Sequence, residues 1–397
     1  MISLVFWILI IVGTVGTVGI ALVACFQPNR STLAVGTSGV GMDCAGWGDR
    51  VRTRLACLGL LASIAGGALG ADAPPALRLR IVGGLGSLNQ FTRHEQPFWD
   101  AELARLSGGR YTAEIVPFDR AGIRSQEVLT LVQLGAVPFA TLPVSGGITK
   151  DPELTAPDLA GLNPDMAALR RSVAAFRPYL EGMMRKRYGI EVLALYAYPA
   201  QVVYCRKPFA GLKGLAGLRV RTSGPAQSDW IEALGGKPVT IGFGDILPYL
   251  ARDELDCAIT GTMSGNTIGL DKVTTHIQPM AISWGLSLFV ANGAAWNALP
   301  ADLRALLKRE LPRVEREIWD ESERETADGL ACDTGAANCK AGRRGGMTLV
   351  ASSPADERLR RQIFTATVLP RWLQRCGPQC AAVWNRTLAH SAGIEAR

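Results

Sequence analysis

The chain has 397 residues, of which 48% are hydrophobic and 19% are charged, and its formal net charge is +7. A chain of this length can form two domains of ordinary size, and the composition is that of a globular protein rather than a disordered one. No run of Lys and Arg is interleaved with aromatic residues, so nothing favours a nucleic-acid partner. The modest positive balance is compatible with an anionic ligand.

Two segments near the N-terminus are candidate targeting signals. Residues 1–26 carry no charge, are long enough to span a bilayer and end in a sequence similar to a bacterial lipobox. The second candidate has three arginines within residues 50–54, an apolar stretch over 55–69 and small residues at a cleavage position. We therefore predict that residues 42–71 are a signal peptide and that the protein is exported to the periplasm. Residues 1–41 are then an over-extended start, the alternative being a membrane or lipoprotein segment that tethers the protein.

The cysteines fall into two sets, three in the targeting region and six beyond it. An even number of cysteines in an exported protein suggests disulfides. We predict local pairing of Cys332 with Cys339 and of Cys376 with Cys380, because each pair is close in sequence and lies beside turn residues. Cys205 and Cys257 are interpreted as buried strand residues. Zinc is the competing interpretation, but there is no pair of C-x-x-C motifs and His is scarce, so no metal is predicted.

Strands and helices alternate from residue 77 onward. Strands are predicted where apolar residues alternate or form short runs, and helices where apolar residues recur with helical spacing between start and stop signals. The expected strands are residues 77–82, 111–117, 137–142, 190–198, 201–205, 218–222, 239–241, 255–259, 277–282 and 286–291. The expected helices are residues 90–106, 125–134, 164–188, 225–234, 243–252, 300–329 and 355–373. This alternation is typical of an α/β fold with mostly parallel sheets.

Two such alternating runs predict two lobes. The chain is expected to pass between them around residues 198–205 and again near 282–286. A two-lobed α/β protein binds its ligand in the cleft, where loops at the strand ends converge. The helix expected over residues 300–329 is unusually long for a globular domain.

The short strand at residues 218–222 carries two arginines. Strand side chains alternate between faces, so Arg219 and Arg221 share one face. Buried arginines need an anionic partner, and a guanidinium matches a carboxylate in bidentate geometry. One hypothesis is that Arg221 anchors a substrate carboxylate. The alternative, which periodicity alone favours, is a pair of solvated arginines on a half-exposed edge strand.

The sequence contains no convincing catalytic set. Its three histidines are isolated, and it has no P-loop, no G-x-S-x-G and no H-E-x-x-H motif. The glycine turn at residues 83–86 lacks the third glycine of a dinucleotide motif, since Asn89 stands in that place. These observations favour a binding protein over an enzyme, and they predict no cofactor.

Four segments taken in order resemble a known family. Gly217-Leu218-Arg219-Val220-Arg221 is followed by Leu234-Gly235-Gly236, then by residues 242–246 and finally by residues 255–261. This succession is similar to the DctP-type substrate-binding proteins of TRAP (tripartite ATP-independent periplasmic) transporters, and the resemblance extends from residue 77 to the C-terminus. It implies a two-lobed periplasmic-binding-protein-like α/β fold in which hinge strands and a long helix bridge both lobes. Residues 77–200 would form mainly lobe 1 and residues 201–285 mainly lobe 2. The return strands, the bridging helix and a disulfide-containing tail would follow over 286–397.

The resemblance also implies a ligand site. Its anchor is Arg221, which would grip the carboxylate of a small organic acid, while the Phe243 ring would line the pocket. Thr260 occupies the place of an asparagine in sialic-acid-binding relatives, or else it caps a helix. Gln201 lies near the place of a second arginine in some relatives. Trp284 would cover the ligand from the hinge side, or else it packs the hinge.

The function implied by the resemblance is solute capture. The open cleft would admit the organic acid, the lobes would close, and the receptor, expected as a monomer, would deliver the ligand to TRAP permease subunits in the membrane. An ABC-type or sensor-linked solute receptor is the first alternative. A secreted enzyme on a two-lobed scaffold is the second.

Overall fold

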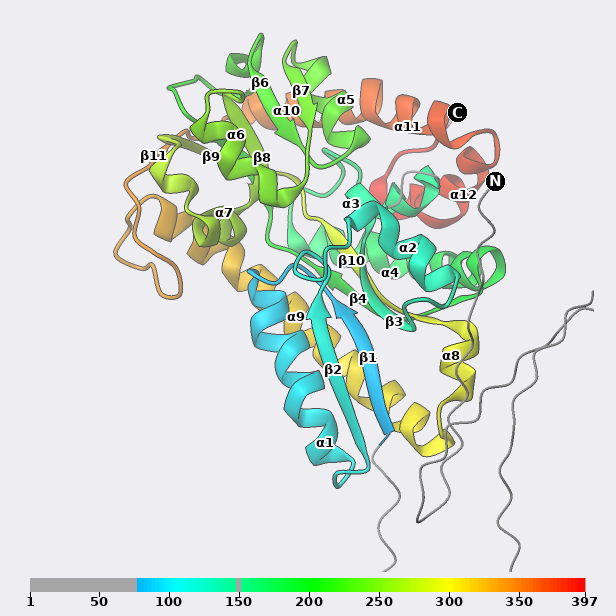
Figure 1. Cartoon of the computed structure of the whole chain (residues 1–397). Helices are drawn as coiled ribbons and strands as arrows, with labels where there is room; N and C mark the ends of the chain where they lie inside the picture. The colour runs from blue at the N-terminus through cyan, green and yellow to red at the C-terminus, as the bar shows by residue number, and fades with distance from the viewer. Residues whose placement is uncertain (1–76, 148–150, 397) are drawn as a thin grey trace, which may run out of the picture. The chain divides into compact units, whose positions relative to one another are not determined.

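The computed structural model describes residues 77–147 and 151–396. The segments 1–41 and 42–71, and with them the predicted signal peptide, lie outside the described residues. The described residues belong to one compact unit. Two β-sheets organise this unit, and we call the part around the first sheet lobe 1 and the part around the second lobe 2 (Figure 1). No helix in the described part of the chain is long and apolar enough to cross a membrane.

Lobe 1 is built on a five-stranded sheet with the order β2-β1-β3-β10-β4. Its strands are β1 (Leu77–Gly83), β2 (Tyr111–Pro117), β3 (Phe139–Pro143), β4 (Ile190–Ala197) and β10 (Leu286–Asn292). The helical segments linked to it are η1 (Gln90–Glu95), η2 (Phe98–Glu102), α1 (Leu103–Leu106), α2 (Ser125–Gln133), α3 (Val144–Gly147), η3 (Pro152–Asp158), α4 (Met166–Met183), η4 (Met184–Tyr188) and α8 (Gly293–Ala298). Each of the strands and longer helices expected from the sequence in this lobe is present, with ends shifted by a few residues.

Lobe 2 is built on a six-stranded sheet with the order β11-β9-β5-β8-β6-β7. Its strands are β5 (Gln201–Cys205), β6 (Arg219–Thr222), β7 (Lys237–Thr240), β8 (Cys257–Gly261), β9 (His276–Ser283) and β11 (Thr348–Leu349). Its helical segments are η5 (Leu212–Leu215), α5 (Pro225–Ala233), η6 (Phe243–Asp245), α6 (Ile246–Ala251), α7 (Thr262–Ile268) and η7 (Leu270–Lys272). The sequence analysis assigned no helix to residues 262–268, because this segment is polar and contains Gly265. In the fold it is buried, and Gly265 allows the close approach of the Tyr204 ring.

The sheets are mixed: five strand pairings among the described residues are parallel and four are antiparallel, so the expectation of mostly parallel sheets holds only narrowly. In lobe 1, β10 runs antiparallel to both β3 and β4, and in lobe 2, β5 runs antiparallel to β8 and β9. The reason is the path of the chain. It leaves lobe 1 through β4 and β5 and returns through β9 and β10, so each outgoing strand lies beside a returning one and must run in the opposite direction.

A long helix, α9 (Ala301–Asp333), packs against both lobes. Its 33 residues span about 50 Å at 1.5 Å per residue. On the lobe 1 side, the indole of Trp319 donates to the carbonyl oxygen of Leu195 at 2.7 Å. On the lobe 2 side, a Cβ at Gly329 would lie 2.3 Å from the backbone nitrogen of Met263, so only glycine lets α7 approach this closely. The expected bridging helix is therefore present and is fitted to each lobe.

The C-terminal tail is more helical than the sequence indicated. The expected helix is present as α10 (Pro354–Ile363), η8 (Phe364–Val368) and α11 (Leu369–Cys376), and two helices that were not expected follow, α12 (Gln379–Thr387) and α13 (Ala389–Ala392). Trp372 and Trp384 pack together at the centre of this tail. The tail contacts α4 and η3 on one side and α5 of lobe 2 on the other, so it also connects the lobes.

The structure contains three disulfides among the described residues. The predicted pairs Cys332–Cys339 and Cys376–Cys380 are both confirmed. The third joins Cys205 to Cys257, which the sequence analysis treated as plain buried strand residues. Both are buried strand residues, but they stand directly opposite each other on the antiparallel strands β5 and β8. This pairing depends on strand register, which their separation of 52 residues does not reveal.

Candidate functional site

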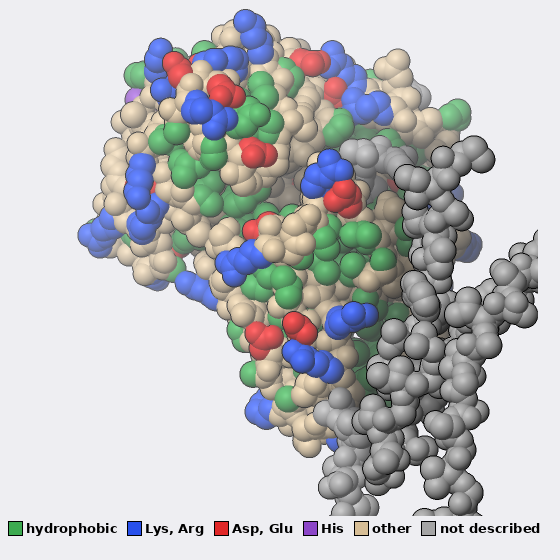
Figure 2. All heavy atoms as spheres, in the orientation of Figure 1, with side chains coloured by type: hydrophobic (Ala, Val, Ile, Leu, Met, Phe, Trp, Pro, Cys, Tyr) green, Lys and Arg blue, Asp and Glu red, His purple; other side chains and the backbone are tan. Residues whose placement is uncertain are grey.

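A cavity of about 580 Å³ lies between the lobes. Figure 2 shows this face of the molecule, with hydrophobic side chains on both sides of the hollow. The walls come from the loops after β1, β2 and β3 in lobe 1, from the ends of β6, β7 and β8 in lobe 2, and from both crossings between the lobes. The site therefore lies where the fold was expected to place it, at strand ends in the cleft.

Arg221 lies in the wall of this cavity, near the end of β6. Its neighbours β7 and β8 hold it at the centre of this half of the sheet, and its side chain is only 5% exposed. Nη1 donates to the carbonyl oxygen of Ile259 at 2.7 Å, and Nε donates to that of Ile241 at 3.2 Å. These two bonds fix the direction of the guanidinium while leaving part of its donor fork for a ligand.

Burial lowers the pKa of Arg221 to about 10, against the opposing effect of the Asp245 charge. The side chain still carries its charge at neutral pH. Within residues 77–147 and 151–396, no carboxylate forms a salt bridge with it. A buried cation that is held only by carbonyl groups is an energetic cost to the unliganded protein, and an incoming anion would offset that cost.

Arg219, two positions earlier on the same strand, has its own partner. Its Nε and Nη2 donate to the Asp256 carboxylate at 3.0 and 2.8 Å, and its backbone N–H donates to the same group at 2.8 Å. The Arg219 side chain lowers the pKa of Asp256 through this bidentate contact. Arg219 is thus half-exposed and paired, and it does not line the cavity.

Three further candidate residues line the cavity with Arg221. The Phe243 side chain lies at the start of η6, and Thr260 lies near the end of β8. Thr260 is not the cap of α7, because Gly261 holds that position. Gln201 stands at the first position of β5, where the chain enters lobe 2.

Trp284 is the candidate that the structure does not bring to the cavity. Its side chain is 3% exposed, and its indole donates to the carbonyl oxygen of Asn163 at 3.1 Å. It is absent from the residues that line the cavity. The role of covering the ligand is therefore corrected in favour of the alternative, packing of the hinge, since the buried indole is bonded to Asn163 and does not line the cavity.

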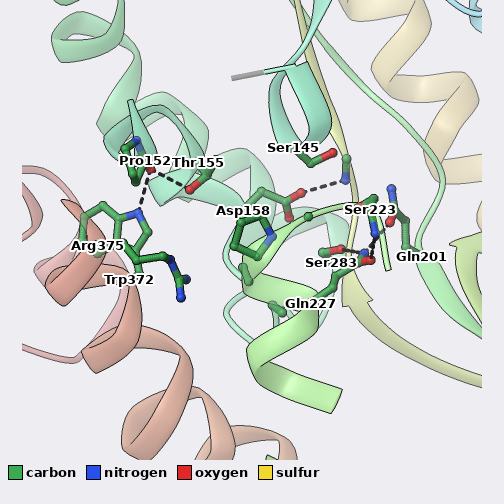
Figure 3. A pocket seen from close by; sticks show the side chains of 15 residues that line it. Ser145, Pro152, Thr155, Asp158, Gln201, Ser223, Gln227, Ser283, Trp372 and Arg375 are labelled. Carbon is green, nitrogen blue, oxygen red and sulfur yellow. Dashed lines mark hydrogen bonds between the residues drawn. The ribbon is translucent and has the colours of Figure 1, made fainter. Parts of the chain in front are cut away.

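A polar cluster next to Gln201 was missed by the sequence analysis. The Gln227 amide nitrogen donates to Gln201 Oε1 at 2.6 Å and to Ser283 Oγ at 2.8 Å, while its oxygen accepts from the backbone of Ser223 at 2.8 Å. Figure 3 shows these side chains pointing toward one another beside a second cavity of about 90 Å³. Both cavities share Gln201 and Gly285 in their walls. The cluster joins three segments that are distant in sequence, so no local sequence pattern predicts it.

Asp158 anchors the returning hinge strand at the second cavity. Its carboxylate accepts the backbone N–H of Gly285 at 2.7 Å and that of Trp284 at 3.1 Å (Figure 3). Burial raises the pKa of Asp158 to about 7, against the effect of these hydrogen bonds. No helix or strand was predicted for the segment that contains Asp158.

The two lobes approach each other closely at Gly224. A Cβ added there would lie 2.6 Å from the carbonyl oxygen of Ser145 in α3 of lobe 1. Both residues line both cavities. A glycine is needed at this position because any side chain would push the lobes apart.

A comparison with protein-family models identifies the family. The model of the bacterial extracellular solute-binding proteins of family 7, named DctP, matches residues 89–334. The chain belongs to this family. The resemblance seen in the sequence is therefore confirmed. A search of curated proteins finds no match.

Solved structures of TRAP solute-binding proteins share the fold. The Bordetella pertussis receptor DctP7, which binds pyroglutamic acid, superposes with a TM-score of 0.67 at 19% identity, covering 78% of this chain and 99% of its own. A TRAP periplasmic solute-binding protein from Shewanella oneidensis with bound succinate gives 0.65 at 20% identity, with coverages of 78% and 98%. A TRAP periplasmic solute-binding protein from Bordetella bronchiseptica with bound mandelate superposes with a TM-score of 0.64 at 18% identity, covering 80% of this chain and 98% of its own. The two-lobed fold of DctP receptors is thus the fold of this chain.

Proposed function

We propose that this protein captures a small organic acid in the cavity between its lobes and delivers it to a TRAP-type permease. The observation that carries the proposal is Arg221, a charged side chain that is 5% exposed, lines the cavity and lacks a carboxylate partner among the described residues. A carboxylate placed against its free donors would form a charge-assisted pair in a desolvated setting. The structural relatives with bound pyroglutamate, succinate and mandelate support an organic acid as the ligand class.

The mechanism we propose is closure of the lobes around the acid. Arg221 receives the carboxylate from the lobe 2 side, Phe243 contacts the body of the ligand, and the crossings at Gln201 and Gly285 act as the hinge. Contacts made with both lobes favour the closed form over the open one, which is what shifts the equilibrium between them. The closed form then docks on the permease.

The cellular setting belongs to the same proposal. Membership in a family of extracellular solute-binding proteins supports a location outside the cytoplasm. We propose the periplasm, with residues 42–71 as the signal peptide and a monomeric receptor. The role is that of a receptor rather than an enzyme.

A thermal-shift screen with a panel of organic acids tests this function. A ligand that binds the folded state alone raises the Tm, by an amount that grows with its concentration over Kd. We expect at least one acid of the panel to raise the Tm of the wild-type protein and to leave that of Arg221→Gln unchanged. A ligand that shifts both proteins equally, or a panel without any binder, would contradict the proposal.

Delivery to the permease needs a separate experiment. Cells that express the receptor together with the TRAP permease subunits should take up the identified acid, and cells lacking either component should not. Uptake that persists without the TRAP permease and depends on an ATP-driven transporter would support the ABC-type alternative instead.

A further inference from the structure

The charges around the ligand cavity are few. Its wall contains four charged side chains, Asp119, Arg124, Arg221 and Asp245. Arg124 is exposed and is already paired with Glu127, to which its Nε donates at 3.0 Å. Arg221 is therefore the single buried cation of this wall without a carboxylate partner, and the two aspartates would repel a second anionic group.

A second polar feature of the cavity wall, Gln201, is uncharged. Its side chain accepts from Gln227, which also donates to Ser283, and these two residues line the adjoining small cavity. The Gln201 amide has two N–H donors, and the carbonyl oxygen of Trp284 takes one of them at 3.3 Å. The other donor suits a hydroxyl, a carbonyl or an amide group of a ligand. A carboxylate there would lose its hydration without gaining a free cation, because Arg375, which lines the adjoining small cavity with Asp158, is already paired with Asp229.

Much of the remaining wall is apolar. Lobe 1 contributes Leu85, Phe118, Ile123, Pro143 and Leu286, and Phe243 faces them from lobe 2. A cavity of about 580 Å³ with such walls is larger than one carboxylate needs. Apolar surface of the ligand would bury well against these side chains, because burial of apolar area is favourable wherever it displaces water.

We infer that the ligand carries a single negative charge: a monocarboxylate with an apolar body and an uncharged hydrogen-bonding group, rather than a dicarboxylate. The carboxylate binds Arg221, the body lies against the apolar wall, and the uncharged group meets the Gln201 amide. This inference rests on the proposed function, since it takes the cavity as a site for organic acids. It makes Gln201 the residue that determines specificity for charge.

Calorimetry with matched pairs of acids tests the inference. Each pair shares one carbon skeleton and differs only in whether the second group is a carboxylate or its amide: malonate and malonamate, succinate and succinamate, phthalate and phthalamate. For the pair that binds best, we expect the half-amide to bind wild-type protein at least about tenfold more tightly than the diacid. Phenylacetate should likewise bind more tightly than acetate, because of its apolar body.

Gln201→Arg provides the reverse experiment. It places a cation where the second carboxylate would lie, so the preference within each pair should shift toward the diacid by about tenfold or more. Gln201→Met, which is similar in length and uncharged, is the matched control and should not gain diacid binding. Circular dichroism and the Tm of each variant show whether it is folded, and the wild-type ranking stands as a test even if a variant does not fold.

The outcomes separate this inference from the proposed function. If the diacids bind wild-type protein more tightly than their half-amides, and Arg221→Gln abolishes that binding, the inference is wrong and the proposed function stands. If Arg221→Gln binds the same acids as wild type, the proposed function fails as well. Binding of the diacids alone, with no monoanion bound, would also overturn the inference.

Discussion

Arg219 and Arg221 stand two positions apart on strand β6, yet their surroundings differ. The Arg219 side chain is 39% exposed and is held by the Asp256 carboxylate in a bidentate contact. Arg221 is 5% exposed and is held by two backbone carbonyl groups. Arg219, at the start of the strand, thus forms an ion pair with a carboxylate. Arg221, at the cavity, has no carboxylate partner among the described residues.

We interpret this difference as that between a structural charge, Arg219, and a charge that is available to a ligand, Arg221. A half-exposed arginine with a carboxylate partner needs nothing further. A buried arginine without one is unfavourable in the unliganded protein, and its pKa is too high for it to escape by losing its proton. A bound anion would complete the environment of Arg221, and this is why we propose that the ligand carboxylate binds there.

The largest expected effect comes from replacing Arg221. Arg221→Gln should weaken binding of the organic acid by about 2–5 kcal/mol, because the ligand carboxylate would then be desolvated without a cation. Titration calorimetry of the best ligand measures this loss directly. Arg219→Gln is the matched control, on the same strand and with the same change in charge, and it should bind as wild type does. If both variants lost the same affinity, the ligand would be attracted by the net positive charge of the region and not by direct contact with Arg221.

Much of the fold could be predicted from the sequence because its signals are local. Apolar periodicity located the strands and longer helices, and the crossings near residues 198–205 and 282–286 followed from two alternating runs. The strand directions could not be predicted, because they depend on which strands lie side by side after the chain returns to lobe 1. The helix at residues 262–268 was missed because its buried face is made of small and polar residues rather than large apolar ones.

The candidate site was predictable only in part. Residues near strand ends, Arg221, Thr260 and Gln201, line the cavity as the sequence and its family resemblance implied. The polar cluster around Gln227 joins β5, α5 and β9, and no local sequence pattern predicts contacts between such distant segments. Trp284 lies beside the hinge as expected, but the side of the backbone on which its ring packs is decided by the tertiary fold.

The second prediction concerns the free energy of unfolding, and in particular the strands that hold Arg221. The disulfide between Cys205 and Cys257 links β5 to β8, the strand whose Ile259 carbonyl group accepts from Arg221. Closing a loop of 52 residues should contribute about 4 kcal/mol to the free energy of unfolding, if it acts on the entropy of the unfolded chain. The double variant Cys205→Ala/Cys257→Ala should lose roughly that amount in chemical denaturation. The local pair Cys376–Cys380, with a separation of 4, should contribute only about 2 kcal/mol.

Ligand affinity is the control for this prediction. Well below the unfolding transition, the double cysteine variant should bind the acid as wild type does, because the sheet hydrogen bonds around Arg221 remain. Loss of affinity without loss of stability would show instead that the disulfide positions the guanidinium.

A third test uses Glu95, a buried carboxylate that can become neutral by protonation. Glu95 is almost fully buried, and its Oε2 accepts from Thr141 Oγ1 at 2.8 Å and from the backbone of Gly84 at 3.0 Å. Its Oε1 has no partner among the described residues. Burial raises the pKa of Glu95 from 4.5 to about 7, against the lowering effect of these hydrogen bonds. Unlike Arg221, it can become neutral at an accessible pH.

The sign of the pH dependence follows from that shift. The folded state holds the Glu95 proton more tightly than the unfolded state, so its contribution to stability is fully present below pH 4.5 and is lost as the pH rises to about 7. Glu95→Gln should therefore match wild type near pH 4 and exceed it near pH 8, by at most roughly 3 kcal/mol. Denaturation at both pH values checks this. Asp158 contributes a slope of the same sign, which cancels in the difference between variant and wild type; a difference that does not change with pH would contradict the prediction.

The smallest expected effect belongs to the Arg219–Asp256 pair. Both side chains are partly exposed, at 39% and 29%, and exposed ion pairs contribute little because water and salt screen them. Arg219→Gln should lower the free energy of unfolding only slightly, and the difference should vanish in about 1 M salt, where the Debye length is about 3 Å. Asp256→Asn should behave in the same way, and the double variant should lose no more than either single one, as expected for two partners in one contact. If removing Arg219 instead weakened ligand binding as strongly as removing Arg221, the contrast between the two ends of β6 would be wrong, and the anion site would have to extend along the whole strand.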